Sequence, residues 1–440
     1  MKIKFSDLDR RSFIGTLAAA GATFVTSRRA VFSQRQGEPA VTEKAPDGPV
    51  LKAGLVGCGG RGRGAAGNFL EAGPNLEVTA LADVFQDRVD EARAVLNGKH
   101  KQEIPGSNCF VGFDAYKKLL DSGVDIMLNA TPPHFRAEHF AAAVAAKKHC
   151  FLEKPVAVDP VGSRSVMETA RKAKAQGLSV MTGTQMRHDK ARIETRKRIL
   201  DGAIGEVLAV RAFRNQGALW FREREPGWSD MEYMIRDWVN WIWLSGDHIV
   251  EQHIHHLDQV NWFMGTHPVK AVGMGGRARR VSGDQYDFFS VDYQFENGVH
   301  MHSTIRQING CANIHEEILV GTKGSCKLEG TIFDRAGKVV WNYEGARNNP
   351  IVQEHVDLVT AIRTNKPVNT AEETAISTLV AIMGRDSAYS GKEVTWGDLM
   401  QSAVRLGPTE YAMGPVDIKA VIPVPGEGGI PAYRSLTTGN

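Results

Sequence analysis

The sequence lacks most of the features that mark specialised classes of protein, and each absence excludes one of them. Its 440 residues carry a formal net charge of only +3, so composition gives no reason to expect nucleic acid or a membrane surface as a partner. No repeat occurs at the periods typical of solenoids or propellers. The hydrophobic share of 42% and the charged share of 23% indicate an ordinary globular protein. At roughly 150 residues per domain, the chain is long for one domain and has room for two.

Cysteine is scarce, and its spacing is not that of a bridge or a metal site. The five cysteines are Cys58, Cys109, Cys150, Cys311 and Cys326. Their number is odd and no CxxC occurs, which argues against a disulfide framework and against a cysteine metal site. We therefore expect these cysteines to be small core residues.

A membrane-spanning run is also missing near the N-terminus, although charges are absent there. Arg10 and Arg11 precede an uncharged stretch that continues to Arg28. This stretch is rich in Gly, Ala and Thr and too short for a transmembrane helix, which needs about 20 mostly apolar residues. Paired arginines before such a stretch are typical of a twin-arginine export signal, which we predict over residues 1–33. The alternative is a basic amphipathic end of the chain without a targeting role.

From residue 51 onward, short apolar runs alternate with amphipathic stretches, after a polar linker predicted over residues 34–49. The predicted strands cover residues 51–56, 77–82, 125–129, 149–152 and 179–184, and the predicted helices cover 64–71, 88–96, 114–120, 139–146 and 161–175. Strands that alternate with helices form parallel units with right-handed crossovers. The pattern predicts an α/β Rossmann domain, with a doubly wound parallel sheet, over residues 50–178.

The pattern of apolar and polar residues changes in the second half of the chain, where we predict a substrate domain over residues 179–406. Strands are expected at residues 206–214, 288–295, 298–305 and 314–320, and helices at 238–244, 250–264 and 353–363. Asn297-Gly298 is a hairpin signal between two of these strands. This pattern predicts a C-terminal α+β domain with a mainly antiparallel open sheet. The Pro/Gly-rich tail, residues 407–440, is expected to wrap over the body or to join a subunit contact.

A dinucleotide site is predicted where the first strand ends. Residues 57–62 read GCGGRG and match GxGxxG, between an apolar strand and a helix, and Asp83 ends the next strand. The expected cofactor contacts there are Gly57, Gly59, Gly60, Arg61 and Gly62, whose glycines allow the turn, the approach of a pyrophosphate and close helix packing. Asp83 can accept hydrogen bonds from a ribose diol, which favours NAD. Arg61 or Arg63 could meet a 2′-phosphate, so NADP stays possible.

Two further segments carry groups suited to proton transfer. Lys154 follows a predicted buried strand, at the edge of the sheet where doubly wound folds bind ligands. The second segment lies in the helix predicted over residues 250–264, where Glu251, His255 and Asp258 share one face at helical spacing. Because a carboxylate beside an imidazole raises its basicity, we expect Glu251 to support His255 as a base.

The histidines of this segment leave a metal site open as an alternative. The candidate ligands are His248, Glu251, His253, His255, His256 and Asp258. At helical spacing His253 and His256 point away from the face of Glu251, so only part of the set could converge on one ion. We expect no metal.

Together these motifs resemble those of the Gfo/Idh/MocA oxidoreductases over about residues 51–363. The resemblance is carried by the glycine turn, Asp83, Thr131-Pro132, Glu153-Lys154-Pro155 and the segment from Glu251 to Asp258. It implies further cofactor contacts at Thr131, Pro132, His134, Glu153 and Lys154. It also implies that Lys154, Glu251 and His255 flank the reacting carbon. The chain departs from the family pattern by having Glu251 in place of Asp and Arg136 in place of the common His.

The resemblance and the chemistry of these groups predict hydride transfer at a sugar or polyol hydroxyl. The hydroxyl would lose its proton to His255, supported by Glu251, while Lys154 steadies the charge on oxygen. Other polar and aromatic side chains suit a carbohydrate pocket. These expected substrate contacts are Gln185, Arg187, His188, Trp220, Arg236, Asp237, Trp238 and Asp258. The expected partner is a small sugar, polyol or glycoside, and family habit implies a homo-oligomer.

We therefore expect an exported, periplasmic oxidoreductase that uses NAD, while Arg61 and Arg63 leave NADP open as the alternative. The twin-arginine route carries folded proteins, so the cofactor could travel with the enzyme and would have to be held tightly. Two alternatives stay open. One is a redox-assisted glycosidase on the same fold, in which oxidation, elimination and re-reduction leave the cofactor unchanged. The other is a non-catalytic sugar-binding protein that contains NAD, which would not need Lys154 or His255.

Overall fold

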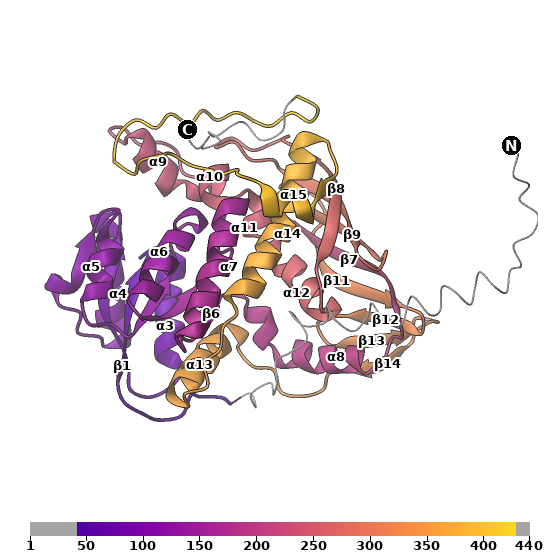
Figure 1. Ribbon diagram of the computed structural model, residues 1–440, viewed down its shortest axis with the longest axis horizontal. Coiled ribbons are helices and arrows are strands. Elements are labelled where there is room, and N and C mark those ends of the chain that lie inside the picture. The colour runs from indigo at the N-terminus through magenta and orange to yellow at the C-terminus, as the bar shows by residue number, and fades with distance from the viewer. Residues whose placement is uncertain (1–41, 428–440) are drawn as a thin grey trace, which may run out of the picture.

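The computed structural model describes residues 42–427, which form two domains that pack side by side (Figure 1). The predicted export signal lies outside the described residues, as do residues 34–41 of the predicted linker. The rest of that linker lies against the first domain, where Ala45 is buried and donates its N–H to the carbonyl of Ala72 at 2.8 Å. None of the helices in residues 42–427 has the length and apolar character needed to cross a lipid bilayer.

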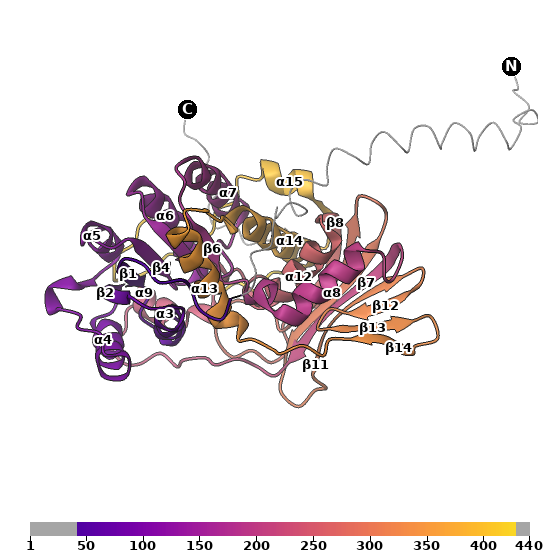
Figure 2. The same ribbon diagram turned by 90° about the horizontal axis from the view of Figure 1, so that it is seen from below.

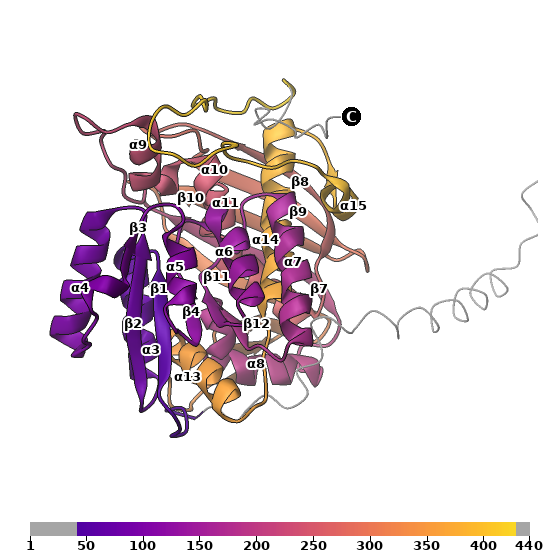
Figure 3. The ribbon, with the colours of Figure 1, turned by 60° about the vertical axis from the view of Figure 1, so that its left-hand side comes forward.

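The first domain is built on a six-stranded sheet in which all neighbouring strands are parallel (Figure 3). Its strands are β1 (Leu51–Val56), β2 (Leu76–Asp83), β3 (Cys109–Val111), β4 (Ile126–Asn129), β5 (His149–Leu152) and β6 (Val180–Thr182). Their order is β3-β2-β1-β4-β5-β6. The predicted Rossmann fold is confirmed. Because β6 belongs to this sheet, the domain extends past the predicted boundary at residue 178.

Helices cover both faces of the parallel sheet, which explains why its strands are nearly continuous apolar runs. One face carries α3 (Gly60–Glu71), α4 (Gln86–His100) and α13 (Pro350–Arg363), and the other carries α5 (Ala115–Asp121), α6 (Pro133–Ala145) and α7 (Pro160–Ala175). Helix α13 comes from far along the chain, so the second half of the sequence completes the first domain.

The second domain is built on a nine-stranded sheet of order β14-β13-β12-β11-β7-β10-β9-β8-β15. Its strands are β7 (Val207–Gln216), β8 (Pro268–Gly276), β9 (Phe288–Phe295), β10 (His300–Gln307), β11 (Ile314–Gly321), β12 (Gly324–Lys327), β13 (Thr331–Asp334), β14 (Val339–Asn342) and β15 (Val394–Thr395). Among the neighbouring pairs in the described residues, β7 and β10 alone are parallel. The predicted mainly antiparallel sheet is thus confirmed, as is the hairpin at Gly298, whose φ is +82°.

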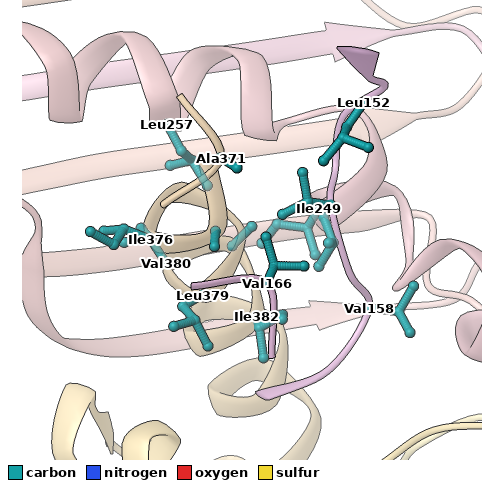
Figure 4. Packing of buried hydrophobic residues seen from close by; sticks show 14 of the residues in the cluster. Leu152, Val158, Val166, Ile249, Leu257, Ala371, Ile376, Leu379, Val380 and Ile382 are labelled. Atoms are coloured by element: carbon teal, nitrogen blue, oxygen red, sulfur yellow. The ribbon is translucent and has the colours of Figure 1, made fainter. Parts of the chain in front are cut away.

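The helices of the second domain lie mostly on one face of its sheet (Figure 2). They are α8 (Lys190–Leu200), α9 (Asp230–Arg236), α10 (Ile242–Ser245), α11 (His248–Glu251), α12 (Ile254–Met264), α14 (Ala371–Ser390) and α15 (Trp396–Gln401). Short 3-10 helices, η2 (Gln185–His188) and η3 (Trp238–Asn240), precede α8 and α10. The long helix α14 joins the domains, because its apolar side chains meet Val166 of α7 and Ile249 and Leu257 of the second domain (Figure 4).

Two expectations about local structure are wrong. The helix predicted over residues 250–264 is interrupted, because α11 ends at Glu251 and α12 begins at Ile254. The cysteines are not all core residues: Cys58, Cys150 and Cys326 are buried, but Cys109 is half-buried and Cys311 is exposed in the loop after β10.

Residues 407–427 of the tail run across the body above α9 and α10 (Figure 1). The carbonyl of Gly414 accepts a hydrogen bond from the N–H of Met231 at 3.1 Å, and the carbonyl of Pro423 accepts one from the hydroxyl of Tyr286 at 2.7 Å. Tyr411 stacks on Phe113 of the first domain, with ring centroids 5.9 Å apart. This part of the tail therefore contacts both domains.

Candidate active site

The turn between β1 and α3 depends on two of its glycines. Gly57 has φ of +90°, and a side-chain Cβ there would lie 2.6 Å from the backbone nitrogen of Thr131. A Cβ at Gly62 would lie 1.8 Å from the carbonyl oxygen of Gly57, so only glycine lets the helix come this close. Gly59 and Gly60 have nothing within 4 Å of a Cβ position. They leave an open cradle at the N-terminus of α3, where unpaired N–H groups favour a phosphate.

This cradle opens into a cavity of about 420 Å³ along the carboxyl ends of β1, β2 and β4. The predicted cofactor residues on its wall are Gly57, Gly59, Gly60, Arg61, Gly62, Asp83, Thr131 and Pro132. Asp83 accepts hydrogen bonds from the N–H groups of Cys58 at 2.7 Å and Phe85 at 3.0 Å. Burial raises the pKa of the Asp83 carboxyl above its ordinary value. The glycine cradle and a carboxylate at the end of β2 fit a dinucleotide with its ribose at Asp83.

The second domain closes one side of this cavity. Trp220, Arg236 and Trp238, which the sequence suggested as substrate contacts, line the same cavity as Asp83. Arg236 of α9 donates two hydrogen bonds to Asp87 of α4, both at 3.0 Å, and its guanidinium lies 3.9 Å from the ring centroid of Phe85. The structure therefore places these three residues beside the adenosine end of the predicted cofactor site.

Asp237, another predicted substrate residue, is fully buried. Its carboxylate accepts hydrogen bonds from the N–H of Arg222 and the side-chain amide of Asn240, both at 2.8 Å. These bonds hold the segment that follows β7 against η3. The carboxylate stabilises the loop that covers the cavity, but it does not line the cavity itself.

Lys154 is buried beyond the end of β5, with 9% of its surface exposed. Its Nζ donates hydrogen bonds to Glu251, at 2.9 Å to the carboxylate and 2.5 Å to the backbone carbonyl. Burial lowers the pKa of Lys154, although Glu251 favours its charged form. Burial opposes ionisation of Glu251, yet the Lys154 ammonium, with Gln252 and Arg136, holds the pKa of Glu251 below its ordinary value. The two groups form a buried ion pair that joins the two domains.

Arg136 fixes the loop that carries Lys154, a role that sequence reasoning missed. Its buried guanidinium donates to the carbonyls of Thr131 at 2.9 Å, Glu153 at 3.0 Å and Pro155 at 2.6 Å. These carbonyls lie in the loops after β4 and β5, on both sides of Lys154. The departure of Arg136 from the family pattern was the signal available in the sequence.

His255 is neutral and is not held by Glu251, contrary to expectation. Within residues 42–427 no hydrogen bond joins the two side chains, because the carboxylate of Glu251 meets Lys154 and Gln252. Burial, together with Lys154, Arg214 and other arginines, lowers the pKa of His255 well below its ordinary value. The expected rise in basicity is thus wrong. The cause is the interruption between α11 and α12, which turns Glu251 toward Lys154.

Three other predicted substrate residues are buried, and their hydrogen bonds and ion pairs connect neighbouring helices. Arg187 donates to Asp258 at 2.8 and 2.7 Å and pairs with Glu373 of α14. His188 hydrogen-bonds Asp357 of α13 at 2.5 Å. Asp258 also accepts a hydrogen bond from Ser377 of α14 at 2.8 Å, so three hydrogen bonds hold its carboxylate. The structure does not bring Arg187, His188 or Asp258 to the cavity, and half-buried Gln185 begins η2 beside them.

Two residues predicted to contact the cofactor act through neighbours. Glu153 accepts a hydrogen bond from Arg61 of the glycine turn at 2.5 Å, and so fixes a side chain on the cavity wall. His134 hydrogen-bonds the hydroxyl of Tyr411 at 2.7 Å, and burial lowers its pKa to about 3. Neither side chain lines the cavity.

The sequence analysis did not predict several of the residues that line the cavity. Phe85 and Arg88 line it directly after Asp83, and Arg222 lines it from the second domain. The place of Phe85 just past the end of β2 was a usable signal, since ligands bind at the carboxyl ends of parallel strands. Among residues 42–427, no three His, Cys, Asp or Glu side chains are grouped as ligands of a metal ion.

The sequence matches two descriptions of one protein family. Residues 51–182 match the NAD-binding Rossmann fold of the Gfo/Idh/MocA oxidoreductase family, and residues 196–395 match its C-terminal α/β domain. The chain is 28% identical to the 2,7-anhydro-N-acetylneuraminate hydratase of Escherichia coli K12 over 211 residues, which is 47% of this chain and 52% of that protein. It is 30% identical to an inositol 2-dehydrogenase of Klebsiella pneumoniae over 167 residues, 38% of this chain and 46% of that protein. The aligned regions thus span about half the length of these curated relatives.

Solved structures share the same fold. The aldose–aldose oxidoreductase of Caulobacter crescentus has a TM-score of 0.62 and 18% identity, with 79% of this chain and 99% of that chain covered. The scyllo-inositol dehydrogenase of Lactobacillus casei, solved with NAD(H) and scyllo-inositol, has a TM-score of 0.60 and 19% identity, with 79% and 99% covered. Identities this low show a shared fold, and the coverage includes both domains.

Proposed function

Because the chain belongs to the Gfo/Idh/MocA oxidoreductase family, with its NAD-binding Rossmann domain at residues 51–182, we propose that it transfers hydride between a sugar or polyol hydroxyl and a tightly held NAD. The observation that carries the proposal is the buried Lys154–Glu251 ion pair beside a neutral His255. Strand β5, which precedes Lys154, lies next to β4, whose end lines the dinucleotide cavity. Catalytic groups and cofactor cradle therefore share one edge of the sheet.

The cofactor, when bound, supplies the acceptor for the hydride of the substrate carbon. The protein supplies the proton chemistry. Lys154 has three N–H groups and gives two of them to Glu251, which leaves the third for the substrate oxygen. A cationic donor at that oxygen stabilises the negative charge that develops as its proton leaves. His255 can accept that proton at a ring nitrogen, because its lowered pKa keeps the ring neutral at physiological pH.

The catalytic assignment is tested by the Lys154→Met variant. We expect sugar- or polyol-dependent reduction of NAD to fall at least about 100-fold, because the charge at the substrate oxygen is no longer stabilised. Cofactor binding, measured by titration of protein fluorescence, should persist, since Lys154 does not line the cavity. Lys270→Met is the matched control, because it removes a lysine from an exposed ion pair with Glu393. Turnover that survives in Lys154→Met would refute the assignment.

A redox-assisted eliminating enzyme, such as a glycosidase, is the second candidate. Two observations favour it: the adenosine side of the cavity is closed by Arg236, which suits a cofactor that does not exchange, and one relative is named a hydratase, not a dehydrogenase. Oxidation of a hydroxyl acidifies the neighbouring C–H bond. Loss of that proton expels the leaving group and forms a double bond, water adds to the double bond, and the hydride then returns to the carbonyl. Incubation with nitrophenyl glycosides distinguishes the two: aglycone release with no net change in cofactor redox state supports this candidate. Lasting NAD reduction by a free sugar supports the first.

We propose that the protein is exported to the periplasm by the twin-arginine route. The support is the Arg10-Arg11 pair ahead of an uncharged stretch, in residues outside those that the structure describes. Tight retention of the cofactor agrees with this route, which carries folded proteins. Replacing Arg10 and Arg11 by lysine should leave the protein in the cytoplasmic fraction, and unchanged periplasmic recovery would contradict export.

We also propose a homo-oligomer that forms through the face of the second sheet opposite α12 and α14. That face exposes apolar side chains from three strands, namely Val272, Met274, Phe288, Ile314 and Val320. These side chains gather on β8 and β9 at one side of the face and on β11 at the other, and exposed apolar side chains of this kind favour an interaction site. Light scattering on the purified protein should show more than one chain per particle, and Met274→Asp should reduce that number. A monomeric wild-type protein would refute the proposal.

A further inference from the structure

A second cavity, of about 370 Å³, lies on the other side of the segment that covers the cofactor site. Side chains of this segment alternate: Trp220 and Arg222 line the first cavity, whereas Leu219 and Phe221 line the second. The opposite wall comes from the end of β10 and from the turn between β8 and β9. The volume is within the range of small-ligand sites and sufficient for one sugar ring.

The fixed charges of this cavity favour an anion. Its wall carries Arg279, Arg280 and one carboxylate, that of Asp287. That carboxylate already accepts the backbone N–H groups of residues 278, 279 and 280, at 2.5, 2.6 and 3.1 Å. Arg279 is exposed at the rim, and among residues 42–427 its guanidinium has no hydrogen-bond or ion-pair partner. A cation is therefore available to a ligand while the local negative charge is already compensated.

A residue on the wall of the same cavity carries a buried donor without an acceptor. Gln307, 2% exposed, lies on the wall, and its Oε1 accepts a hydrogen bond from Arg280 at 2.9 Å. Because the guanidinium can only donate, this contact fixes which end of the amide is oxygen. The Nε2 of Gln307 is then a buried donor with no partner among the described residues. A buried unpaired donor is costly, so an acceptor of the ligand would relieve that cost.

The carboxyl ends of β7 and β10, in the second sheet, link the second cavity to the segment that carries Glu251. Gln307 of β10 pairs with Gln216 in the parallel register with β7. Two residues earlier on β7, Arg214 donates a hydrogen bond at 2.8 Å to Gln252, which follows Glu251. A ligand whose hydroxyl is bound by Lys154 could therefore extend along the carboxyl ends of β7 and β10 toward Gln307.

We propose that this cavity binds a carboxylate-bearing sugar unit of the uronic acid type, as the part of the substrate that is not oxidised. The carboxylate pairs with Arg279, the Nε2 of Gln307 donates to a ring or hydroxyl oxygen, and Leu219 and Phe221 cover the apolar face of the ring. The inference rests on the proposed function for its substrate class, sugars, but it concerns a site that carries no reacting group.

Calorimetric titration of the full-length protein with D-glucuronate and D-glucose tests the proposal. We expect saturable binding of glucuronate and at least tenfold weaker binding of glucose. Arg279→Gln removes the free cation, and Gln307→Glu replaces the donor by an acceptor while keeping the oxygen that faces Arg280. Each change should weaken glucuronate binding about tenfold. Arg335→Gln, the same change at an exposed residue in the turn between β13 and β14, is the matched control and should have no effect.

Three results would overturn the proposal: no glucuronate binding at millimolar concentration, equal binding of glucose, or binding that neither variant weakens. Because Arg279 is exposed, its variant is expected to fold, and a thermal melt confirms this for both. The titration involves no turnover, so its outcome is independent of the oxidoreductase assay. Loss of glucuronate binding with NAD reduction intact would refute this cavity alone. Glucuronate binding without any sugar-dependent reduction would refute the proposed function alone.

Discussion

Single side chains in this protein take their charge from burial as much as from their partners. Glu354 of α13 is 1% exposed, and both of its carboxylate oxygens lack a hydrogen-bond partner among the described residues. Burial and the nearby Glu153 raise the pKa of Glu354 well above its ordinary value, although Arg61 opposes the rise. The folded state therefore holds a proton here at pH values where an unfolded carboxyl would have released it. A charged Glu354 destabilises the fold.

Glu354→Gln is expected to stabilise the protein at neutral pH. For a group whose folded pKa is raised, stability decreases as pH rises above the unfolded pKa of about 4.3, by about 1.4 kcal/mol per unit of pKa shift. Glutamine has the same shape without this penalty, so the variant should gain stability at pH 7 and lose the advantage toward pH 4. Urea denaturation at both pH values measures it. Glu372→Gln is the control, because Glu372 is a half-exposed glutamate paired with the exposed Arg171, and this variant should change stability by less than about 1 kcal/mol. A destabilised Glu354→Gln would contradict the assignment.

At the scale of elements, helix α3 can approach β1 closely because Gly62 has no side chain. Gly62→Ala would place a Cβ 1.8 Å from the backbone oxygen of Gly57, and backbone yields less readily than a side chain. We expect a loss of about 3 kcal/mol, the upper end for overpacking. Gly60→Ala is the matched control, because its Cβ meets no atom within 4 Å. Its melting temperature should stay within a few degrees of wild type, while NAD binds more weakly because the methyl occupies the cradle. Equal melting temperatures for the two variants would contradict this account.

Helix α9 is expected to act as a clamp on the cofactor. Arg236 pairs with Asp87, holds the pKa of that carboxyl below its ordinary value, and stacks on Phe85 at the cavity wall. An exposed ion pair and a cation–π contact contribute about 1 kcal/mol each at most. Arg236→Ala should therefore speed NAD dissociation roughly tenfold, as followed by stopped-flow fluorescence. Arg224→Ala removes an exposed ion pair with Asp230 outside the cavity and should leave the rate unchanged. If the two variants released NAD equally fast, α9 would not be a clamp.

Some elements were visible in the sequence and others were not, for a physical reason. The strands at residues 51–56, 149–152 and 288–295 were predicted with their observed bounds, because short apolar or alternating runs identify strands. Helix α14 was missed: sixteen of its twenty residues are buried, so it has no polar face and no amphipathic period. The interruption at residues 252 and 253 was missed because the apolar spacing continues across it.

At the scale of the whole molecule, buried histidines should make the fold sensitive to mild acid. Burial, partial for His134 and His255 and complete for the others, lowers the pKa of seven histidines, to about 3 for His134 and His139: the set is His134, His139, His248, His253, His255, His256 and His355. In the unfolded chain these rings take up protons below about pH 6.5, which the folded state does not do. Their contribution to stability is therefore present above pH 6.5 and is lost as pH falls below it. Carboxyls with raised pKa, such as Glu354, oppose this effect and limit it.

We expect the melting temperature to fall by several degrees between pH 7.5 and pH 5.5, as measured by scanning calorimetry. Each histidine that stays neutral contributes up to about 1.4 kcal/mol per pH unit. His355→Phe should flatten the dependence, because the ring of His355 lies 4.1 Å from that of Phe151 and neither ring nitrogen has a partner among the described residues. A melting temperature that stays constant or rises over this pH range would contradict the prediction.

The sequence by itself determined the features that depend on neighbours along the chain. The glycine turn with Asp83, the alternation of strands and helices, and the place of Lys154 after a strand all follow from local steric and periodic rules. The tertiary structure decided which charged groups meet: Lys154 with Glu251, Arg187 with Asp258, and Arg236 with Asp87. Periodicity shows which residues share a face of one element. It does not show which other element packs on that face, and in the low-dielectric interior that neighbour sets the charge and partner of every polar group.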